Sequence, residues 1–449
     1  MTTFLYRGVS TLLLILLKGG DFLSKYRNSI VCGLDVASEF SIACILDPEG
    51  NVGLRSYKII HSLQGFNSFL SIVNDIVKSH NQAPIVFALE STGIYHMTLL
   101  TFLKNNNFEV LLINPLITNS NKNNSIRKVK NDKKDAFSIA NLVKYQDIKV
   151  SFLPSLDILR LRAFIREYFY LGDEYAKFKL KLGNVLAYTW PGYSNVFSDI
   201  ASLASINILS TYPSATSFLN ADKADILKLL SPSRKGSKWC ETKYSQLLSC
   251  ANDTSSLSNV DQPFIVQSFV SMISSLDKNI GILFNSLQDF INSKDFDQSV
   301  KYNIDLIKSI PGCGFISAVA IIAEIGDFAR FSKPKELIAY FGLDPEVNQS
   351  GKFTADKVKI SKRGPRIARR ALFFIALASI RKGKNKQPIN SVLKAYYDKK
   401  CVSKVKMSAL SCVMHKIVKI LFSVLREQKT FSLRTPEDHI NQFLNNQAA

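Results

Sequence analysis

The sequence lacks the paired cysteines that structural zinc sites and disulfide frameworks use. Its seven cysteines in 449 residues are odd in number and lie far apart, with no Cys-x-x-Cys pair among them. The positions are Cys32, Cys44, Cys240, Cys250, Cys313, Cys401 and Cys412. This pattern argues against structural zinc and against a secreted disulfide scaffold, and it predicts a protein of the reducing cytoplasm.

A long hydrophobic run is also missing near the start of the chain. The most apolar run there, from Thr11 to Leu17, is much shorter than the roughly 20 residues that cross a bilayer. No small-residue cleavage site of a signal peptide follows it. We therefore expect no transmembrane helix and no membrane partner, and we expect residues 1–28 to be a dispensable extension.

Acidic residues are scarce relative to basic ones. The chain has 36 Asp and Glu against 57 Lys and Arg, which leaves a net charge of +21. Because Lys and Arg neutralise phosphates and release their counterions, this balance predicts a nucleic-acid partner. An anionic membrane surface is the alternative. The length predicts more than one domain.

Residues 29–150 have the pattern of a mixed α/β domain. Helical segments are predicted after the third, fourth and fifth strands, and the last helix begins at Asp132. An antiparallel start followed by strand-helix alternation predicts a mixed sheet with helices packed on it. The predicted strands are Ile30–Val36, Phe40–Leu46, Leu54–Ile60, Ile85–Leu89 and Glu109–Ile113.

Residues 151–300 are predicted to form a helical middle region with a coiled coil. Between Pro154 and Pro191, apolar residues alternate three and four positions apart, from Leu161 to Val185, as in a coiled-coil seam. A second such stretch, from Phe269 to Phe290, can pack antiparallel to the first or against a second subunit. The Ser-rich segment 194–260 contains no motif. An all-α domain over 301–430 and a tail over 431–449 complete the prediction.

Four acidic residues are the candidate metal ligands. Asp35 lies in the first predicted strand and Glu90 directly follows the fourth, at positions where open α/β sheets place their sites. Asp132 and Asp135 are three residues apart at the start of a helix, so they share one face. Four hard oxygen ligands suit Mg²⁺ in phosphoryl transfer.

Each acid also has an ordinary structural explanation. Asp35 can be a structural acid and Glu90 a cap for the residues that follow it, while Asp132 and Asp135 suit a helix N-terminus. Three separate segments that bring acids to one small domain favour the metal site. Two flanking basic residues are predicted to bind nucleic acid, Lys130 and Lys133.

The C-terminal region contains a glycine turn and a cluster of basic residues. The run from Pro311 to Gly314, between two predicted helices, resembles a helix-hairpin-helix, whose glycines leave backbone N–H groups free for a DNA phosphate. A plain helix-helix turn is the alternative. The local density of basic residues predicts phosphate contacts. The candidates are Lys362, Arg363, Arg366, Arg369 and Arg370.

Several short motifs together resemble a known family. The segments Gly33–Val36, Ala88–Gly93, Asn114–Pro115 and Lys130–Ala136 are similar to the DEDD transposase domain of the insertion-sequence one-ten family, which includes the Piv DNA invertases. The resemblance implies an RNase H-like, RuvC-like fold for the N-terminal domain and assigns the four acids as its metal ligands.

The C-terminal motifs are similar to the second transposase domain of the same family. These are Phe341–Pro345, Asn348–Lys352 and Ile360–Gly364. The resemblance implies that Ser350, in Gln-Ser-Gly, is the nucleophile that joins covalently to DNA. A serine hydroxyl needs activation, and no histidine lies close to Ser350 in sequence. We therefore expect the two domains to form one composite centre.

The resemblance also implies a function and partners. It implies a Mg²⁺-dependent transposase or recombinase that inserts and excises an insertion sequence through a 5′-phosphoserine intermediate. A structured bridge RNA would pair with the element ends and the target DNA, and dimers would assemble into a tetramer. The alternatives are a structure-specific nuclease similar to a Holliday-junction resolvase, and a non-catalytic nucleic-acid-binding relative.

Overall fold

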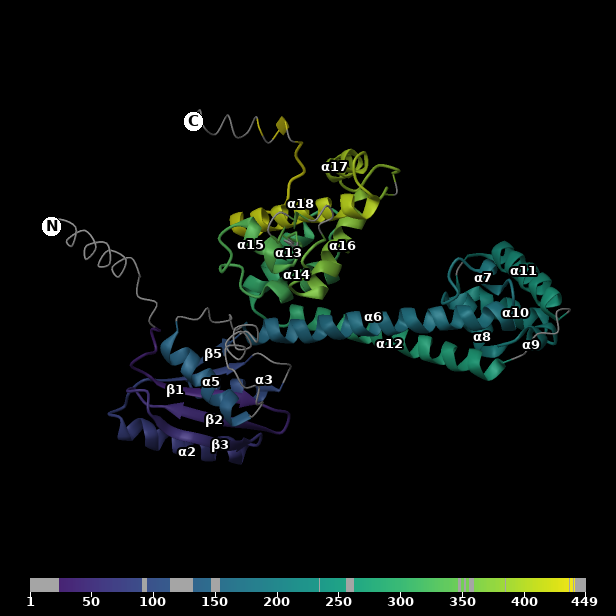
Figure 1. The fold of residues 1–449 in the computed structure, drawn as a ribbon. Coiled ribbons are helices and arrows are strands. Elements are labelled where there is room, and N and C mark those ends of the chain that lie inside the picture. Colours follow the sequence, from purple (N-terminus) through teal and green to yellow (C-terminus); the bar gives the residue numbers. More distant parts are fainter. Residues whose placement is uncertain are drawn as a thin grey trace. The chain divides into compact units, whose positions relative to one another are not determined.

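The computed structural model divides the chain into two compact units, residues 1–153 and 154–449 (Figure 1). The structure describes residues 24–90, 95–113, 132–146, 154–233, 235–255, 262–345, 349–350, 353–354, 359–383, 385–435, 437–438 and 440.

The first unit contains the predicted mixed sheet. Its strand order is β3-β2-β1-β4-β5, with β1 antiparallel to β2, β2 antiparallel to β3, and β4 parallel to both β1 and β5. The opening hairpin and the later strand-helix alternation are therefore confirmed. The strands are β1 (Ile30–Val36), β2 (Phe40–Leu46), β3 (Val52–Ile60), β4 (Ile85–Glu90) and β5 (Glu109–Ile113).

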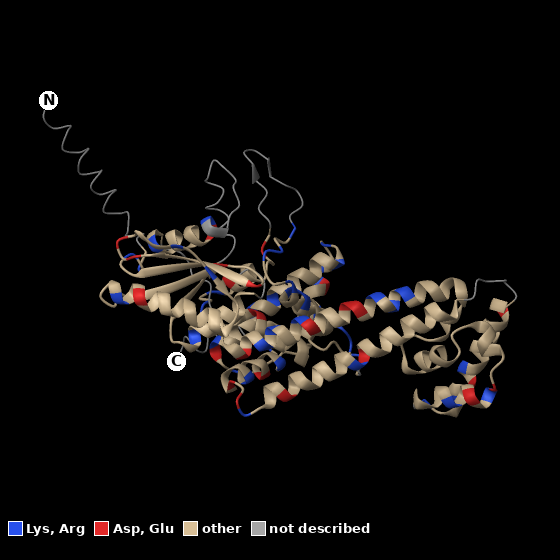
Figure 2. Cartoon of the chain, turned by 90° about the horizontal axis from the view of Figure 1, so that it is seen from below, with Lys and Arg blue, Asp and Glu red and all other residues tan. Residues whose placement is uncertain are grey.

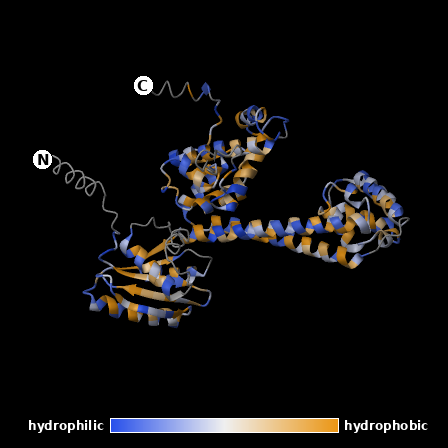
Figure 3. Cartoon of the chain, in the orientation of Figure 1, coloured by the Kyte–Doolittle hydropathy of each residue, from blue (hydrophilic) through white to orange (hydrophobic). Residues whose placement is uncertain are grey.

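Helices cover both faces of this sheet. Helices α2 (Leu63–Ser79) and α3 (His96–Asn105) pack on the face that carries Ile30, Cys32 and Leu34. Helix α5 (Asp132–Tyr145) packs on the opposite face. Both faces are covered, so the central strands are almost continuously apolar, and they appear hydrophobic in Figure 3.

The segment before β1 is part of the folded unit from Ser24 onward. The Ser24 side chain is buried and donates a hydrogen bond to the carbonyl oxygen of Val143 at 2.5 Å. Tyr26 packs in the core under α5, and its hydroxyl donates to Glu109 Oε1 at 2.6 Å. The expectation of a dispensable extension over residues 1–28 therefore narrows to the residues before Ser24.

The second unit is built on two long helices. Helices α6 (Leu156–Thr189) and α12 (Pro263–Asn292) lie against one another along their length (Figure 1). The start of α6 shares a core with the end of α12, and the end of α6 shares another core with the start of α12. The helices are therefore antiparallel within one chain. Coiled-coil packing between them stays a prediction.

A small helical module lies at the far end of this helix pair. Its core surrounds Trp190 and Tyr193, both fully buried. The Ser-rich segment, in which the sequence shows no motif, thus forms helices. They are α7 (Tyr193–Val196), α8 (Leu203–Thr211), α9 (Ala215–Leu219), α10 (Lys223–Leu230), the 3-10 turn η1 (Ser231–Ser233) and α11 (Ser237–Ser255).

The remaining elements form a helical C-terminal core around α14. This core also includes the first turns of α6 and the last turns of α12. Helix α18 is long and apolar enough to cross a membrane, but 56% of its apolar stretch is buried in the unit, as in the core helix of a globular protein. The elements are α13 (Gln298–Lys308), α14 (Phe315–Ile325), α15 (Pro334–Tyr340), β6 (Gln349–Ser350), β7 (Phe353–Thr354), α16 (Arg366–Ile380), α17 (Ser391–Cys401) and α18 (Lys406–Glu427).

Candidate functional site

Asp35 and Glu90 lie side by side at one edge of the sheet. In the parallel register of β1 and β4, Leu34 is the partner of Leu89, so the next residues, Asp35 and Glu90, are also neighbours. Val31 and Val86 pack under α5, and side chains alternate along a strand. Asp35 and Glu90 therefore lie on the α5 face, and both are half-buried.

The first turn of α5 lies at the same edge of the sheet. A Cβ on Gly33 would stand 2.2 Å from the carbonyl oxygen of Ala136, so only glycine lets α5 approach β1 this closely. Asp135 precedes Ala136 and is half-buried. Asp132 is the first residue of α5, and its side chain lies outside the described part of the structure.

This arrangement fits a hard divalent cation. Acidic residues on two adjacent strands and near the start of α5 lie at one edge of one face. Carboxylate oxygens are the donors that Mg²⁺ prefers, and acids on separate rigid elements can hold it without a dedicated loop. The role of Asp35, Glu90, Asp132 and Asp135 as ligands stays a prediction.

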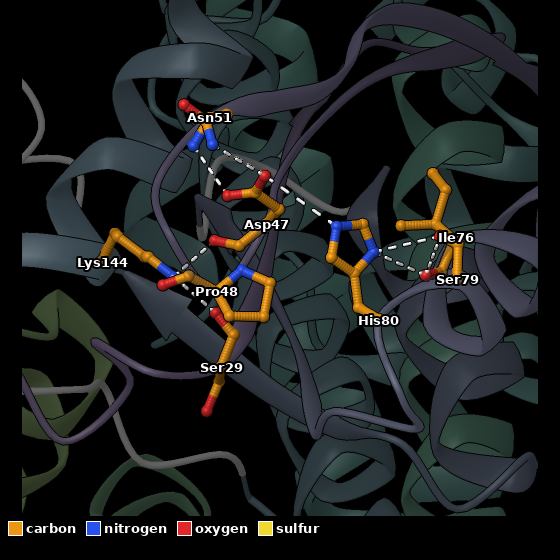
Figure 4. Close-up of polar contacts among 8 residues, drawn as sticks. All are labelled: Ser29, Asp47, Pro48, Asn51, Ile76, Ser79, His80 and Lys144. Atoms are coloured by element: carbon orange, nitrogen blue, oxygen red, sulfur yellow. Dashed lines mark hydrogen bonds and ion pairs between the residues drawn. The ribbon is translucent and has the colours of Figure 1, made fainter.

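A second cluster lies at the opposite edge of the sheet, where β2 ends and α2 ends (Figure 4). It consists of Asp47, Glu49 and His80, whose ligand atoms lie within 4.8 Å of one another. Asp47 is buried and accepts hydrogen bonds from the backbone and the side-chain amide of Asn51 at 2.7 and 3.1 Å. Burial acts to raise the pKa of Asp47, but these hydrogen bonds outweigh it and keep the pKa below its usual value.

His80 and Lys144 complete the surroundings of this cluster. Nδ1 of His80 lies 2.9 Å from the carbonyl oxygen of Ile76, and Nε2 lies 3.9 Å from Asp47 Oδ2. Lys144 Nζ donates to the carbonyl oxygens of Ser29, Asp47 and Pro48 at 2.7, 2.6 and 3.1 Å. Burial lowers the pKa of Lys144, and the nearby carboxylates partly offset this effect. Its ammonium thus links the end of α5 to the residue before β1 and to the turn after β2.

This cluster was not predicted from the sequence. The run from Asp47 to Gly50 predicts a turn, and two acids two residues apart in a turn are common on protein surfaces. His80 is more than thirty residues further along. One signal in the sequence could have located this cluster: the predicted hairpin of β1 and β2 places the end of β2 beside the start of β1. The C-terminus of α2 lies in the same region.

Ser350 lies in the second unit, at the end of a short hairpin strand. Its backbone pairs with Phe353 of β7, and Gln349 pairs with Thr354. The serine side chain and the residues of the connecting turn lie outside the described part of the structure. The position of Ser350 relative to the four acids is not determined, so the composite centre stays a prediction.

The predicted phosphate-binding residues before and within α16 fall into two groups. Lys362, Arg363 and Arg366 are exposed. Arg369 instead donates to the carbonyl oxygens of Phe341 and Gly364 at 3.1 and 2.8 Å. These contacts fasten the start of α16 to the end of α15, so the guanidinium has a structural role in addition to any contact with nucleic acid.

Arg370 also has partners within the unit. It forms an ion pair of 2.7 Å with Asp173 of α6, and its guanidinium lies 4.8 Å from the ring centre of Phe169. Lys133 lies in α5, with its side chain outside the described residues, as is the whole of Lys130. Lys and Arg are distributed over both units in Figure 2. Nucleic-acid binding by these residues stays a prediction.

The glycine turn of the second unit packs against α16. Gly312 has φ +94°, and a Cβ there would stand 2.5 Å from Ser379 Oγ. Ser379 donates to the carbonyl oxygen of Pro311 at 2.8 Å. Gly314 is exposed, at the start of α14. The turn joins α13 and α14 as the sequence predicts, and its binding of DNA stays a prediction.

Comparison with protein families defines the class of the protein first. Residues 32–191 match a family model described as a transposase of the DEDD type, and this range contains all four predicted acids. The fold of the first unit, a mixed sheet with acids at one edge, agrees with this nuclease-like class. The chain is a protein of the transposase class.

A second match identifies the family. Residues 304–398 match the model of the transposase IS116/IS110/IS902 family, and this range contains Ser350. The two matches cover the two transposase domains of that family in the expected order. The chain belongs to the IS110 family of transposases. The family and the cluster of Asp47, Glu49 and His80 both indicate divalent-metal binding.

Individual relatives agree with this family. The chain is 32% identical over 126 residues to the transposase for insertion sequence element IS1111A of Coxiella burnetii, which is 28% of this chain and 33% of that protein. It is 28% identical over 138 residues to the pilin gene-inverting protein of Moraxella lacunata; these residues are 31% of this chain and 41% of that protein. It is 27% identical over 132 residues to an insertion element IS110 protein of Streptomyces coelicolor; these residues are 29% of this chain and 31% of that protein. The chain thus matches about a third to two fifths of the length of these relatives.

Proposed function

We propose that this chain is a DNA transposase or recombinase that inserts and excises an insertion sequence. The observation that carries the proposal is the edge of the first sheet, where Asp35 and Glu90 are neighbours on parallel strands and α5 begins beside them. Together with Asp132 and Asp135, these acids hold Mg²⁺ in the proposed centre. Bound there, the ion supplies positive charge to the attacking and leaving oxygens of a phosphodiester.

Ser350 is the proposed nucleophile. Its Oγ attacks the phosphorus of a DNA phosphodiester, and the new Oγ–P bond forms as the bond from phosphorus to the 3′ oxygen breaks. The serine proton passes to a base, and the departing 3′ oxygen takes up a proton. The product is a 5′-phosphoserine link and a free 3′-hydroxyl. Attack by the 3′-hydroxyl of another strand then releases Ser350 and completes strand exchange.

Basic residues of the second unit hold the phosphates in this proposal. Lys362, Arg363 and Arg366 are exposed near the start of α16 and are available to bind the scissile strand. Lys130 and Lys133, which flank Asp132 in sequence, are proposed to bind it as well. The helix-hairpin-helix turn around Gly312 contributes backbone N–H groups. Because the sequence contains no base-reading motif such as a zinc finger, recognition of the element ends and the target is delegated to a bridge RNA.

Assembly and location follow from the same proposal. Dimers that associate into a tetramer bring several serines and acid sets to two DNA duplexes, and the α6–α12 pair offers coiled-coil surfaces for this contact. We retain the division into a RuvC-like domain over 29–150, a helical middle over 151–300, a transposase domain over 301–430 and a tail over 431–449. A cytoplasmic protein suits this chemistry and the unpaired cysteines.

The runner-up is a metal-dependent nuclease that uses the acids and water alone. A relative named as a pilin gene-inverting protein favours the recombinase, because inversion needs religation as well as cutting. The test is to incubate the purified chain with its native flanking DNA and Mg²⁺. Ser350→Ala should abolish cleavage and strand exchange together, whereas a nuclease would keep cutting. Sequencing of the RNA that co-purifies with the chain tests whether a bridge RNA guides it.

A further inference from the structure

The first turn of α17 carries a buried donor without an acceptor. Asn390 is the N-cap of this helix: its Oδ1 accepts the backbone N–H of Leu393 at 2.9 Å. That hydrogen bond fixes which end of the side-chain amide is oxygen. Nδ2 therefore lies beside Oδ1 at the N-terminus of the helix, and Asn390 is only 1% exposed. Among the described residues, Nδ2 has no hydrogen-bond partner.

A basic hairpin leads into this helix end. The hairpin, whose described residues are 381–383 and 385–390, is closed by the hydrogen bond from the Ile389 N–H to the carbonyl oxygen of Arg381 at 2.9 Å and by the pairing of Lys382 with Pro388. Arg381, Lys382 and Lys386 are exposed on it. The sequence from 381 to 397 contains no Asp or Glu, and the nearby Asp398 is held by Lys394. The surroundings of Asn390 are thus strongly positive.

These observations favour an acceptor that carries negative charge. A buried donor left unsatisfied costs about 1–3 kcal/mol, so Asn390 destabilises the chain unless an acceptor reaches Nδ2. The N-terminal N–H groups of a helix and its dipole favour an anion at the same point. The hairpin cations favour an anion as well. Because Nδ2 is itself buried, the residues that cover it must move on binding for an oxyanion of the size of a phosphodiester to reach it.

We propose that the N-terminus of α17, with Asn390 and the 381–390 hairpin, is a binding site for a phosphate of the nucleic-acid backbone. The inference rests on the proposed function, since it presumes a nucleic-acid partner. The site is separate in sequence from the four acids and from Ser350. It positions bound nucleic acid on the second unit without reading its sequence, because phosphate contacts carry no base information.

The test measures binding of the full chain to a fluorescein-labelled DNA duplex of arbitrary sequence, by fluorescence anisotropy over a series of salt concentrations in EDTA. Asn390→Asp keeps the cap, because Asp caps helices as well as Asn, but it replaces the donor with a negative charge. It should weaken binding about tenfold and lower the salt slope by about one. Its thermal unfolding should match that of the wild-type chain.

Asn74→Asp is the matched control, since it makes the same substitution at an exposed position of α2, outside the proposed site. It should weaken binding about twofold at most. Asn390→Ser also keeps a cap but adds no charge, and it should weaken binding clearly as well. Equal binding by Asn390→Asp and Asn74→Asp, or wild-type binding by Asn390→Ser, would overturn the site.

A further variant tests the site even if the Asn390 variants do not fold. The double substitution of Lys382 and Lys386 by Gln changes only exposed side chains and should also weaken binding and lower the salt slope. Unchanged binding by this variant would overturn the site. Binding in EDTA needs no chemistry at Ser350, so it tests the site separately from the proposed function. If the variants bind DNA as the wild-type chain does at every salt concentration, and the wild-type chain forms the Ser350 adduct, the site is refuted and the proposed function is not. If the wild-type chain forms no Ser350 adduct while the variants still bind DNA more weakly than the wild-type chain, the proposed function is refuted and the site is not.

Discussion

Lys144 shows how a single buried charge can join distant parts of the first unit. Its side chain is 1% exposed, and each of its three ammonium protons has a carbonyl acceptor. Two of the acceptors, Asp47 and Pro48, lie in the turn after β2, and the third, Ser29, precedes β1. Such complete pairing is what makes a buried charge tolerable.

Replacing Lys144 by Met should therefore destabilise the first unit by about 3 kcal/mol, because three carbonyl groups, one buried and two half-buried, lose their donor. Hydrogen exchange of the β1 and β2 amides in the full chain measures this. Lys134→Met on the exposed side of the same helix is the control and should have little effect. Equal amide protection in the two variants would show that the hydrogen bonds from Lys144 to the three carbonyl groups do not stabilise this edge of the sheet.

The cysteines offer a test of burial at the same scale. Burial raises the pKa of the Cys44 thiol to about 11 and that of Cys313 to about 12. At pH 8 only about one Cys44 thiol in a thousand would be a thiolate, the form that reacts. Iodoacetamide at pH 8 should label the half-exposed Cys401 and Cys412 first, with Cys44 and Cys313 labelled only on unfolding. Mass spectrometry reads the order, and rapid labelling of Cys44 would contradict the packing of β2.

The residue scale also shows what sequence could foresee. The places of Asp35 and Glu90 in the sheet were predictable, because Asp35 lies next to the end and Glu90 at the end of a clearly patterned strand. The contacts of Lys144 were not predictable, and neither was the approach of His80 to Asp47. The residues in contact are 33 to 115 positions apart in sequence, and their contacts depend on how the helices pack on the sheet. The ion pair of Arg370 with Asp173 was missed for the same reason: local basic density does not reveal a partner on another helix.

At the scale of elements, the contact of α5 with β1 decides the geometry of the candidate metal site. Gly33 lies two residues before Asp35, and the backbone of α5 at Ala136 fills the space of its missing side chain. The distance between helix and strand sets the distance between Asp135 and Asp35. A larger residue at position 33 must push the helix away from the strand.

Gly33→Val should therefore lower activity more than stability alone explains. We expect a loss of at least about a hundredfold in DNA cleavage, since a displacement of about 1 Å can cost that much in a catalytic site. Cleavage is measured at a temperature where circular dichroism shows the variant folded. Gly281→Ala, in α12 with open space around it, is the control and should retain activity. Full activity of Gly33→Val would mean that α5 carries no essential ligand.

The elements themselves were predictable to different degrees. The bounds of β1, β2 and β5 agree with the sequence pattern, because alternating or continuous apolar residues end in clear turn signals. The helices of the module from α7 to α11 were not predicted. Their apolar residues are scattered among Ser and Asn, and the segments are short, so the core around Trp190 becomes evident only in three dimensions.

At the scale of the whole molecule, the family matches cover residues 32–191 and 304–398 and leave the module from α7 to α11 between them. The module has its own core, so it can vary without disturbing either transposase domain. The two long helices α6 and α12 connect it to the C-terminal core. The arrangement of the two units, on which a composite centre depends, could be predicted only from the family resemblance.

The start of the folded chain gives a second prediction at this scale. Deletion of residues 1–23 should leave stability and activity unchanged, whereas deletion of residues 1–28 should lower the unfolding temperature by several degrees. The longer deletion removes the buried hydrogen bonds of Ser24 and Tyr26. Thermal unfolding of both variants measures the difference. Equal stability would show that these hydrogen bonds contribute nothing.

The most direct measurement of the central proposal is a covalent link between the chain and DNA. The purified protein is incubated with labelled element-end DNA, its co-purified RNA and Mg²⁺, then denatured and separated by size. A labelled adduct should form and map to Ser350 by mass spectrometry. Ser350→Ala, Asp35→Asn and the omission of Mg²⁺ should each abolish it, and Ser332→Ala should not. An adduct that survives in Ser350→Ala, or cleavage with no adduct at all, would contradict the account.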